Sequence, residues 1–274
     1  MSRPPISVRP VTPVIGAEVS GVDLDDLDEA GFEAIRDALM AHGVLFFRDQ
    51  ELSIAGQKAF GARFGELVVH PNDPGVEGHP EVMRIHADSS SKRATGERWH
   101  SDVSCDPVPP MGSILRMYTV PESGGDTLFS SMYAAYEALS GRMRAMLDGL
   151  TAIHDGGPYY REVNRLIGRE DGGREYPSAA HPVIRTHPVT GRKAVFVNGM
   201  FTVRIVELPP RESDAVLGFL FAHVERPDLQ CRFRWRENSV AFWDNRCTQH
   251  HAIWDYWPET RSGYRVTIRG ERPV

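Results

Sequence analysis

The sequence lacks the segments that would direct a protein into or across a membrane. No apolar run approaches the ~18 residues needed to span a bilayer. The first residues, Met1-Ser2-Arg3-Pro4-Pro5, have no apolar core behind their charge, so they do not form a typical secretory signal peptide. We therefore expect a cytoplasmic protein with no membrane partner.

The chain is also poor in cysteine and has little excess charge. Its three cysteines, Cys105, Cys231 and Cys247, are an odd number without a CxxC pair, which argues against a disulfide framework or a structural zinc site. The formal net charge of −6 gives no reason to expect nucleic acid or an anionic membrane as partner. Any site for an anion must therefore be built locally.

What the sequence does contain is the composition of an ordinary globular domain. Its hydrophobic content is 41%, and we find no internal repeat, low-complexity tract or break in composition. Large β domains reach this length as one unit, so we expect a single domain over residues 1–274. Helical spacing of apolar residues predicts helices near 28–42, 53–64 and 209–225 and a pair near 131–148.

Most of the remaining chain consists of short apolar segments between Gly/Pro-rich turns, as in β proteins. The expected strands are 6–9, 17–19, 44–47, 82–86, 113–119, 127–131, 150–154, 182–187, 193–198, 229–235, 239–243 and 264–269. Long loops, which often form lids or binding sites, are expected at 71–80, 87–98 and 155–180. The pattern predicts a mainly β fold with flanking helices, a sandwich or barrel of which the jelly roll is one form.

Two histidines and an aspartate have the composition of a facial metal triad. His100 and Asp102 are two residues apart, so on an extended strand both would point to one face, and His250 would arrive from another strand. Such a triad holds non-haem Fe(II) and leaves coordination positions open. Catalytic zinc sites use the same donors, although no HExxH motif is present. A surface His100 and a packed core His250 are the ordinary alternatives.

Two arginines follow the second histidine. A guanidinium binds a carboxylate bidentately and stays charged, so Arg261 could hold a carboxylate-bearing cosubstrate, or it could be a solvated surface charge. Arg265 lies four residues further on, and on one strand both arginines would face the same cavity. One arginine could then serve a cosubstrate and the other an anionic substrate.

Six segments, in this order along the chain, carry a likeness to a known family. They are WHSDV (99–103), GGDTLFSSM (124–132), HPVIRTHPVTGRKAVFVN (181–198), FTVRIVEL (201–208), WDNRCTQHHA (243–252) and RVTIRGERP (265–273). The chain resembles the Fe(II)/2-oxoglutarate-dependent dioxygenases of the taurine dioxygenase and 2,4-dichlorophenoxyacetate dioxygenase group, from about Val11 to Pro273, and is most similar to the taurine dioxygenase branch. This resemblance implies a double-stranded β-helix, the cupin-like jelly roll.

The resemblance also implies a set of catalytic and cofactor-binding residues. His100, Asp102 and His250 match the iron ligands, and Thr127 and Arg261 match the residues that bind the distal carboxylate of 2-oxoglutarate. Such an enzyme uses Fe(II), 2-oxoglutarate and O2, forms succinate and CO2, and hydroxylates a substrate C–H bond. A zinc hydrolase and a non-catalytic metal-bound sensor are the alternatives.

For the substrate, the resemblance implies an anionic head group. His70, the backbone N–H of Val103 and Arg265 match the positions that hold this head, and Tyr160 and Phe201 match apolar walls. We expect a small anionic substrate, taurine or another alkylsulfonate, that releases sulfite and an aldehyde once hydroxylated beside sulfur. Alkyl sulfatase-type and aryloxyalkanoate-type dioxygenases are the alternatives, and a homodimer or tetramer is expected.

Two positions depart from the family pattern near the amine of taurine. Where relevant members carry a tyrosine and an asparagine, this chain has Asp73 and Gly96. Asp73 could pair with an ammonium group, whereas Gly96 removes a side-chain partner and enlarges the pocket. Polar partners discriminate strongly between substrates and apolar pockets weakly, so the far end of the substrate stays open at this point.

Overall fold

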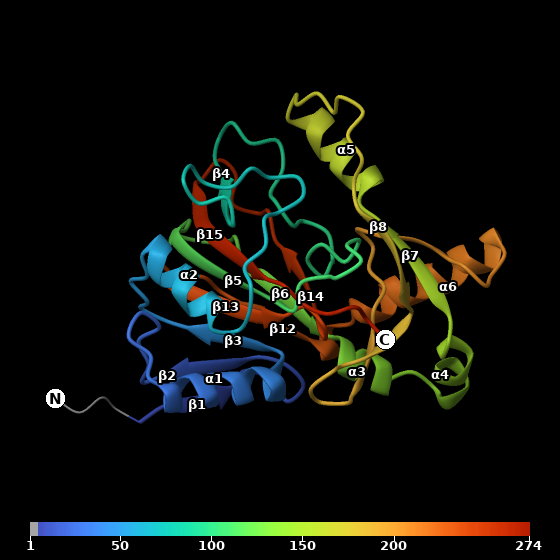
Figure 1. Cartoon of the computed structure of the whole chain (residues 1–274), viewed down its shortest axis with the longest axis horizontal. Coiled ribbons are helices and arrows are strands. Elements are labelled where there is room, and N and C mark those ends of the chain that lie inside the picture. The colour runs from blue at the N-terminus through green and yellow to red at the C-terminus, as the bar shows by residue number, and fades with distance from the viewer. Residues whose placement is uncertain (1–4) are drawn as a thin grey trace.

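A seven-stranded β-sheet forms the centre of the computed structural model, which describes residues 5–274 (Figure 1). In sheet order its strands are β1 (Ser7–Pro10), β2 (Ala17–Ser20), β3 (Val44–Phe47), β13 (Ser239–Asp244), β5 (Gly112–Thr119), β15 (Arg261–Ile268) and β4 (Val82–Ala87). All neighbouring pairs are antiparallel except β2 and β3. The sheet therefore contains strands from both the N-terminal and the C-terminal parts of the chain.

A three-stranded sheet packs against one face of the large sheet. Its order is β12 (Gln230–Phe233), β6 (Thr127–Ser131) and β14 (Thr248–Ala252), with both pairs antiparallel. Side chains from both sheets share one hydrophobic cluster, in which Phe46 stacks on Phe233 with ring centroids 4.0 Å apart. The sheets face each other without closing into a continuous barrel.

Two helices cover the opposite face of the large sheet. They are α1 (Glu29–His42) and α2 (Ile54–Ala62). Ser53 caps the second helix, because its side chain accepts the N–H of Gly56. Leu39 of α1 joins the hydrophobic cluster on this side of the sheet. The spacing of apolar residues therefore predicted both helices correctly.

A third region, at the right of Figure 1, packs beside the two sheets. It has its own hydrophobic cluster. Its elements are α3 (Met132–Glu137), α4 (Gly141–Leu147), β7 (Thr151–Asp155), β8 (Ser178–Pro182), β9 (Ile184–Thr186), β10 (Lys193–Val195), β11 (Thr202–Ile205), α6 (Pro210–Val224) and the 3-10 turn η1 (Pro227–Leu229). The helices expected near 131–148 and 209–225 are confirmed, whereas β11 was not predicted.

The prediction of a long loop over 155–180 was wrong. This segment contains α5 (Gly157–Leu166), which projects at the top of Figure 1, and the start of β8. Tyr159, Tyr160 and Asn164 are buried on one side of α5, and the charged residues that suggested a loop lie mostly on its outer side.

The strand expected over 182–187 was also only partly correct. It is divided at Val183, because β8 pairs with β7 whereas β9 pairs with β10. The other two expected loops, 71–80 and 87–98, contain no helix or strand apart from Ala87, the last residue of β4.

The structure also bears on the disulfides and the membrane-spanning segments that the sequence lacks. All three cysteines are buried and free, which confirms that the chain has no disulfide framework. Within residues 5–274, no helix combines the length and apolar character that crossing a membrane requires.

A buried polar network joins β7 to the centre of the protein. Nδ1 of His154 lies 3.0 Å from Oγ of Ser104, and its Nε2 lies 3.3 Å from Oγ1 of Thr202. Nδ2 of Asn198 donates to the same Ser104 oxygen at 2.8 Å. Burial, followed by the neighbouring His181, lowers the pKa of His154 to about 3. His154 is therefore neutral in the folded protein at physiological pH.

This buried histidine predicts an acid-sensitive fold. In the unfolded chain His154 takes up a proton below pH 6.5, whereas the folded protein binds that proton only near pH 3. Its contribution to the free energy of unfolding should thus fall, as pH drops from 6.5 to 4.5, by at most about 1.4 kcal/mol per pH unit. In His154→Gln, the free energy of unfolding, measured by urea titration at a series of fixed pH values, should fall less steeply as the pH drops. An unchanged slope would show that His154 does not cause the sensitivity.

Candidate functional site

His100, Asp102 and His250 converge on one buried point between the two facing sheets. Their potential ligand atoms all lie within 4.8 Å of one another. Nε2 of His100 is 3.6 Å from Oδ1 of Asp102, and Nε2 of His250 is 4.0 Å from the same oxygen. The predicted triad is therefore assembled by the fold.

Backbone pairing brings the two histidines together. His250 lies in β14, and His100 forms an isolated antiparallel bridge with it. The N–H of His100 donates to the carbonyl of His250 at 3.1 Å, and the reciprocal bond measures 2.8 Å. The two imidazole centroids are consequently 4.1 Å apart.

Asp102 reaches the same point by a different route from the one expected. The segment is extended only as far as the bridge at His100, and residues 102–105 form a turn. Val103 in this turn has a φ of +45°, a strained conformation for a β-branched residue. The prediction that His100 and Asp102 converge is confirmed, but the continuous strand invoked for it was wrong.

The protonation states of this cluster suit a metal site. Burial alone would raise the pKa of Asp102, but Arg265 and the two histidines hold it well below its usual range. Burial, followed by the neighbouring His100, lowers the pKa of His250 well below its usual value. A carboxylate and a neutral imidazole are the forms that ligate metals, so the donor set fits a divalent ion.

A narrow cavity leads from the triad to Arg261 and Thr127. Both predicted residues line it together with His100, His250 and Arg265. The cavity therefore brings a guanidinium and a hydroxyl group together with both imidazoles of the predicted triad.

Arg261 forms no ion pair within residues 5–274. Its Nε donates to the carbonyl of Gly125 at 3.0 Å, while its buried Nη2 has no hydrogen-bond partner within residues 5–274. Thr127 accepts a hydrogen bond from Nε1 of Trp235 at 2.9 Å, which fixes its hydroxyl beside the cavity. A buried guanidinium with an unused donor is a site prepared for an anion, because an unpaired buried charge is costly.

A larger cavity of about 240 Å³ also borders the triad, at His100 and Asp102. All five predicted substrate positions line it: His70, Val103, Tyr160, Phe201 and Arg265. The ring of Tyr160 lies 5.8 Å from the rings of both His70 and Phe201, measured between centroids. Its buried hydroxyl has no hydrogen-bond partner within the described residues. The wall is thus aromatic with one unused polar atom.

Arg265 stands between the two cavities and lines both. Its Nη1 donates to Oδ1 of Asp102 at 2.7 Å, and its buried Nε has no partner within residues 5–274. The expectation that Arg261 and Arg265 face one cavity is confirmed, because both line the narrow cavity.

His70 presents a neutral donor to the larger cavity. Burial, followed by the charge of Arg265, lowers the pKa of His70 to about 3. Nδ1 accepts the N–H of Asn72 at 3.2 Å, so the ring proton lies on Nε2.

The two departures from the family pattern both lie at the larger cavity. Asp73 lines it, but one carboxylate oxygen already accepts the N–H of Gly75 at 2.9 Å. Gly96 lines both cavities with a φ of +84°, and a Cβ there would lie 3.3 Å from Cε1 of His100. The missing side chain therefore leaves space directly beside the imidazole of His100, a predicted metal ligand.

Several residues at the site gave no local signal in the sequence. Trp235 and Ser113 contact Thr127 and Asp102, respectively, through single hydrogen bonds. The cavity wall also includes Met83, Tyr159, Val163 and Met200. Only the three-dimensional packing places these residues, because none belongs to a pattern with metal-binding or catalytic spacing.

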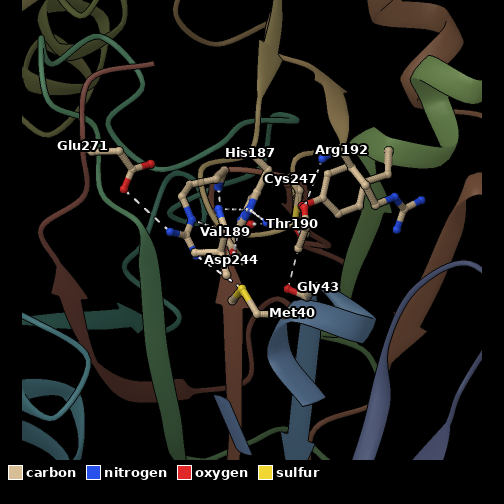
Figure 2. Close-up of polar contacts among 12 residues, drawn as sticks. Met40, Gly43, His187, Val189, Thr190, Arg192, Asp244, Cys247 and Glu271 are labelled. Atoms are coloured by element: carbon tan, nitrogen blue, oxygen red, sulfur yellow. Dashed lines mark hydrogen bonds and ion pairs between the residues drawn. The ribbon is translucent and has the colours of Figure 1, made fainter. Parts of the chain in front are cut away.

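His187, Asp244 and Cys247 form a second cluster of residue types that can ligate metals (Figure 2). Their potential ligand atoms are already hydrogen-bonded or, in Cys247, held as a protonated thiol. Nδ1 of His187 accepts the N–H groups of Val189 and Thr190, so Nε2 carries the proton and donates to Asp244 at 3.1 Å. Both oxygens of Asp244 also accept from Arg246. Burial raises the pKa of Cys247 to about 12. This cluster is a structural network at the end of β13.

Comparison with known proteins places the chain in a family. The family model "Taurine catabolism dioxygenase TauD, TfdA family" matches residues 7–267. An alpha-ketoglutarate-dependent sulfate ester dioxygenase of Pseudomonas putida is 38% identical over 278 residues, covering 98% of this chain and 91% of the relative. An alkylsulfatase of Acinetobacter baylyi is 36% identical over 276 residues, covering 97% and 86%.

A solved structure agrees with these sequence matches. A taurine dioxygenase from Burkholderia xenovorans superposes with a TM-score of 0.86 at 40% identity, covering 99% of this chain and 93% of that one. The predicted jelly-roll fold class is thereby confirmed, and the zinc hydrolase and sensor alternatives lose their support. The chain belongs to the TauD/TfdA family of Fe(II)- and 2-oxoglutarate-dependent dioxygenases.

Proposed function

We propose that His100, Asp102 and His250 bind the Fe(II) of this dioxygenase, and that Thr127 and Arg261 bind the distal carboxylate of 2-oxoglutarate. The observation that carries this proposal is the buried, unpartnered Nη2 of Arg261, which shares a narrow cavity with the triad. A dicarboxylate spanning that cavity would reach the metal with one end and neutralise Arg261 with the other. When bound, iron together with 2-oxoglutarate and O2 supplies the oxidising power for C–H hydroxylation.

The larger cavity is proposed to bind a sulfonate or sulfate head group. Arg265 offers charge, neutral His70 offers a ring N–H, and the turn at Val103 offers a backbone N–H. All three line the cavity beside the triad. An anion held there would direct its neighbouring carbon toward the metal-binding atoms. Hydroxylation of that carbon gives an unstable adduct, which collapses to an aldehyde and releases sulfite from a sulfonate or sulfate from a sulfate ester.

The far end of this cavity favours an apolar tail over the ammonium group of taurine. Besides Asp102, Asp73 is the one carboxylate that lines this cavity, and its Oδ1 already accepts the N–H of Gly75, while the exposed cations Lys92 and Arg169 line the same cavity. The inner wall contains Val163 and Met200. A cationic tail would meet like charge, whereas an alkyl chain would bury apolar surface. We therefore infer an alkylsulfonate or alkyl sulfate ester as the substrate class.

Four expectations from the sequence stay predictions. They concern the single domain over residues 1–274, the homodimer or tetramer, the cytoplasmic location and the lack of a nucleic-acid partner.

Removing Arg261 tests the cosubstrate half of the proposal. Arg261→Ala leaves the distal carboxylate facing a buried site without its cation, and breaking such a pair costs roughly 3–5 kcal/mol. The affinity for 2-oxoglutarate, titrated anaerobically on the Fe(II) enzyme, should fall by about a hundredfold or more. Arg226→Ala, which removes an exposed arginine paired with Asp228, is the matched control. An affinity unchanged in Arg261→Ala would refute the assignment.

Filling the space at Gly96 tests the substrate half. Asparagine tolerates the left-handed backbone, and its Cβ would crowd His100. In Gly96→Asn, kcat/KM should fall several-fold more for a secondary alkyl sulfate, branched at the reacting carbon, than for its linear isomer. Gly78→Asn is the control, because Gly78 has a φ of +76° and no atom near its missing Cβ. Equal losses on both isomers would show that Gly96 does not shape this part of the pocket.

A further inference from the structure

The carboxylate of Asp102 is held on both oxygens by different elements. Ser113, a fully buried residue of β5, donates its hydroxyl to Oδ2 at 2.7 Å. Arg265 donates to Oδ1 at 2.7 Å, and Oδ1 is the oxygen that faces Nε2 of both histidines. A carboxylate oxygen can accept more than one partner, so Oδ1 can accept from Arg265 and still ligate a metal, while the bond from Ser113 to Oδ2 fixes the rotation of the carboxylate. The two oxygens therefore have distinct surroundings.

Asn245 fixes the direction of the serine hydroxyl. Its Oδ1 accepts the backbone N–H of Asp102 at 3.1 Å and Nε1–H of Trp243 at 3.0 Å, so its Nδ2 must face Ser113. That Nδ2 donates to Oγ of Ser113 at 3.1 Å. Because an amide nitrogen only donates and a carboxylate only accepts, the single hydroxyl proton of Ser113 points to Oδ2 of Asp102.

The register of the large sheet holds this ring of hydrogen bonds in place. Ser113 of β5 pairs with Trp243 of β13, two residues before Asn245. The N–H of Asn245 donates to the carbonyl of Met111 at 2.9 Å. Between them, Asp244 is fixed by the buried network of Figure 2. Asn245 and Ser113 are thus rigidly placed relative to the turn that carries Asp102.

We propose that Ser113 and Asn245 are positioning residues that restrict Asp102 to ligating the metal through Oδ1 alone. This inference rests on the proposed role of Asp102 as an iron ligand. A facial triad leaves three of six positions open, and 2-oxoglutarate with O2 needs all three. If the carboxylate could rotate until Oδ2 also reached the metal, Asp102 would occupy one of those positions. The hydroxyl of Ser113 therefore keeps the cosubstrate site open.

The proposal is tested by measuring two affinities on the same variants. Ser113→Ala frees Oδ2, so Mn(II) binding without 2-oxoglutarate should be retained or become tighter. The affinity of the Mn(II)- or Fe(II)-loaded protein for 2-oxoglutarate, titrated anaerobically, should fall about tenfold or more. Asn245→Ala should shift both affinities in the same directions. Ser113→Thr keeps a hydroxyl and should restore 2-oxoglutarate binding.

Ser130→Ala is the matched control. Ser130 is equally buried in a strand, but its hydroxyl donates to the carbonyl of Val224. Both affinities should be unchanged in this control. If both affinities fall together in Ser113→Ala, or neither changes, the positioning role is overturned. If the wild-type protein itself shows no metal-dependent binding of 2-oxoglutarate, the proposed function fails instead.

Discussion

The buried negative charge of Asp102 is the constraint on which the site depends. Its side chain is 3% exposed, and a carboxylate without partners at such a position would be strongly destabilising. Arg265, Ser113 and the backbone contact to Asn245 each compensate part of this cost. A dication between Asp102 and the two histidines would compensate more. Because Arg265 also lines the larger cavity, an anion bound there and a metal at the triad would be electrostatically linked through one guanidinium.

The fold meets this constraint by bringing separate elements to one point. The bridge between His100 and β14 supplies the imidazoles, the turn after it supplies the carboxylate, and β15 supplies both arginines. These pieces come from the two facing sheets, whose shared hydrophobic cluster fixes their separation. The narrow and the larger cavity both border the triad, so a cosubstrate in one and a substrate in the other could reach the same metal.

Local patterns in the sequence predicted the parts of the site that follow from short spacing. The strand period shared by Arg261 and Arg265 on β15 is a feature of this kind. The convergence of His100 and Asp102 was also predicted, but a turn and not the expected strand brings Asp102 into place. Ser113 could not be predicted, because its contact with Asp102 depends on the register between β5 and β13, which pair over a long sequence separation. Helix α5 was not predicted, because its charged residues made the segment look polar although two of its tyrosines, Tyr159 and Tyr160, are buried.

The central claim is that this chain couples oxidation of 2-oxoglutarate to hydroxylation of an alkylsulfonate or alkyl sulfate ester. The most direct measurement follows succinate together with sulfite or sulfate in one reaction that contains Fe(II), 2-oxoglutarate, O2 and each compound of such a panel. The account predicts that at least one apolar-tailed compound releases its sulfur oxyanion in a one-to-one ratio with succinate. Succinate formed without sulfite or sulfate across the whole panel would contradict it.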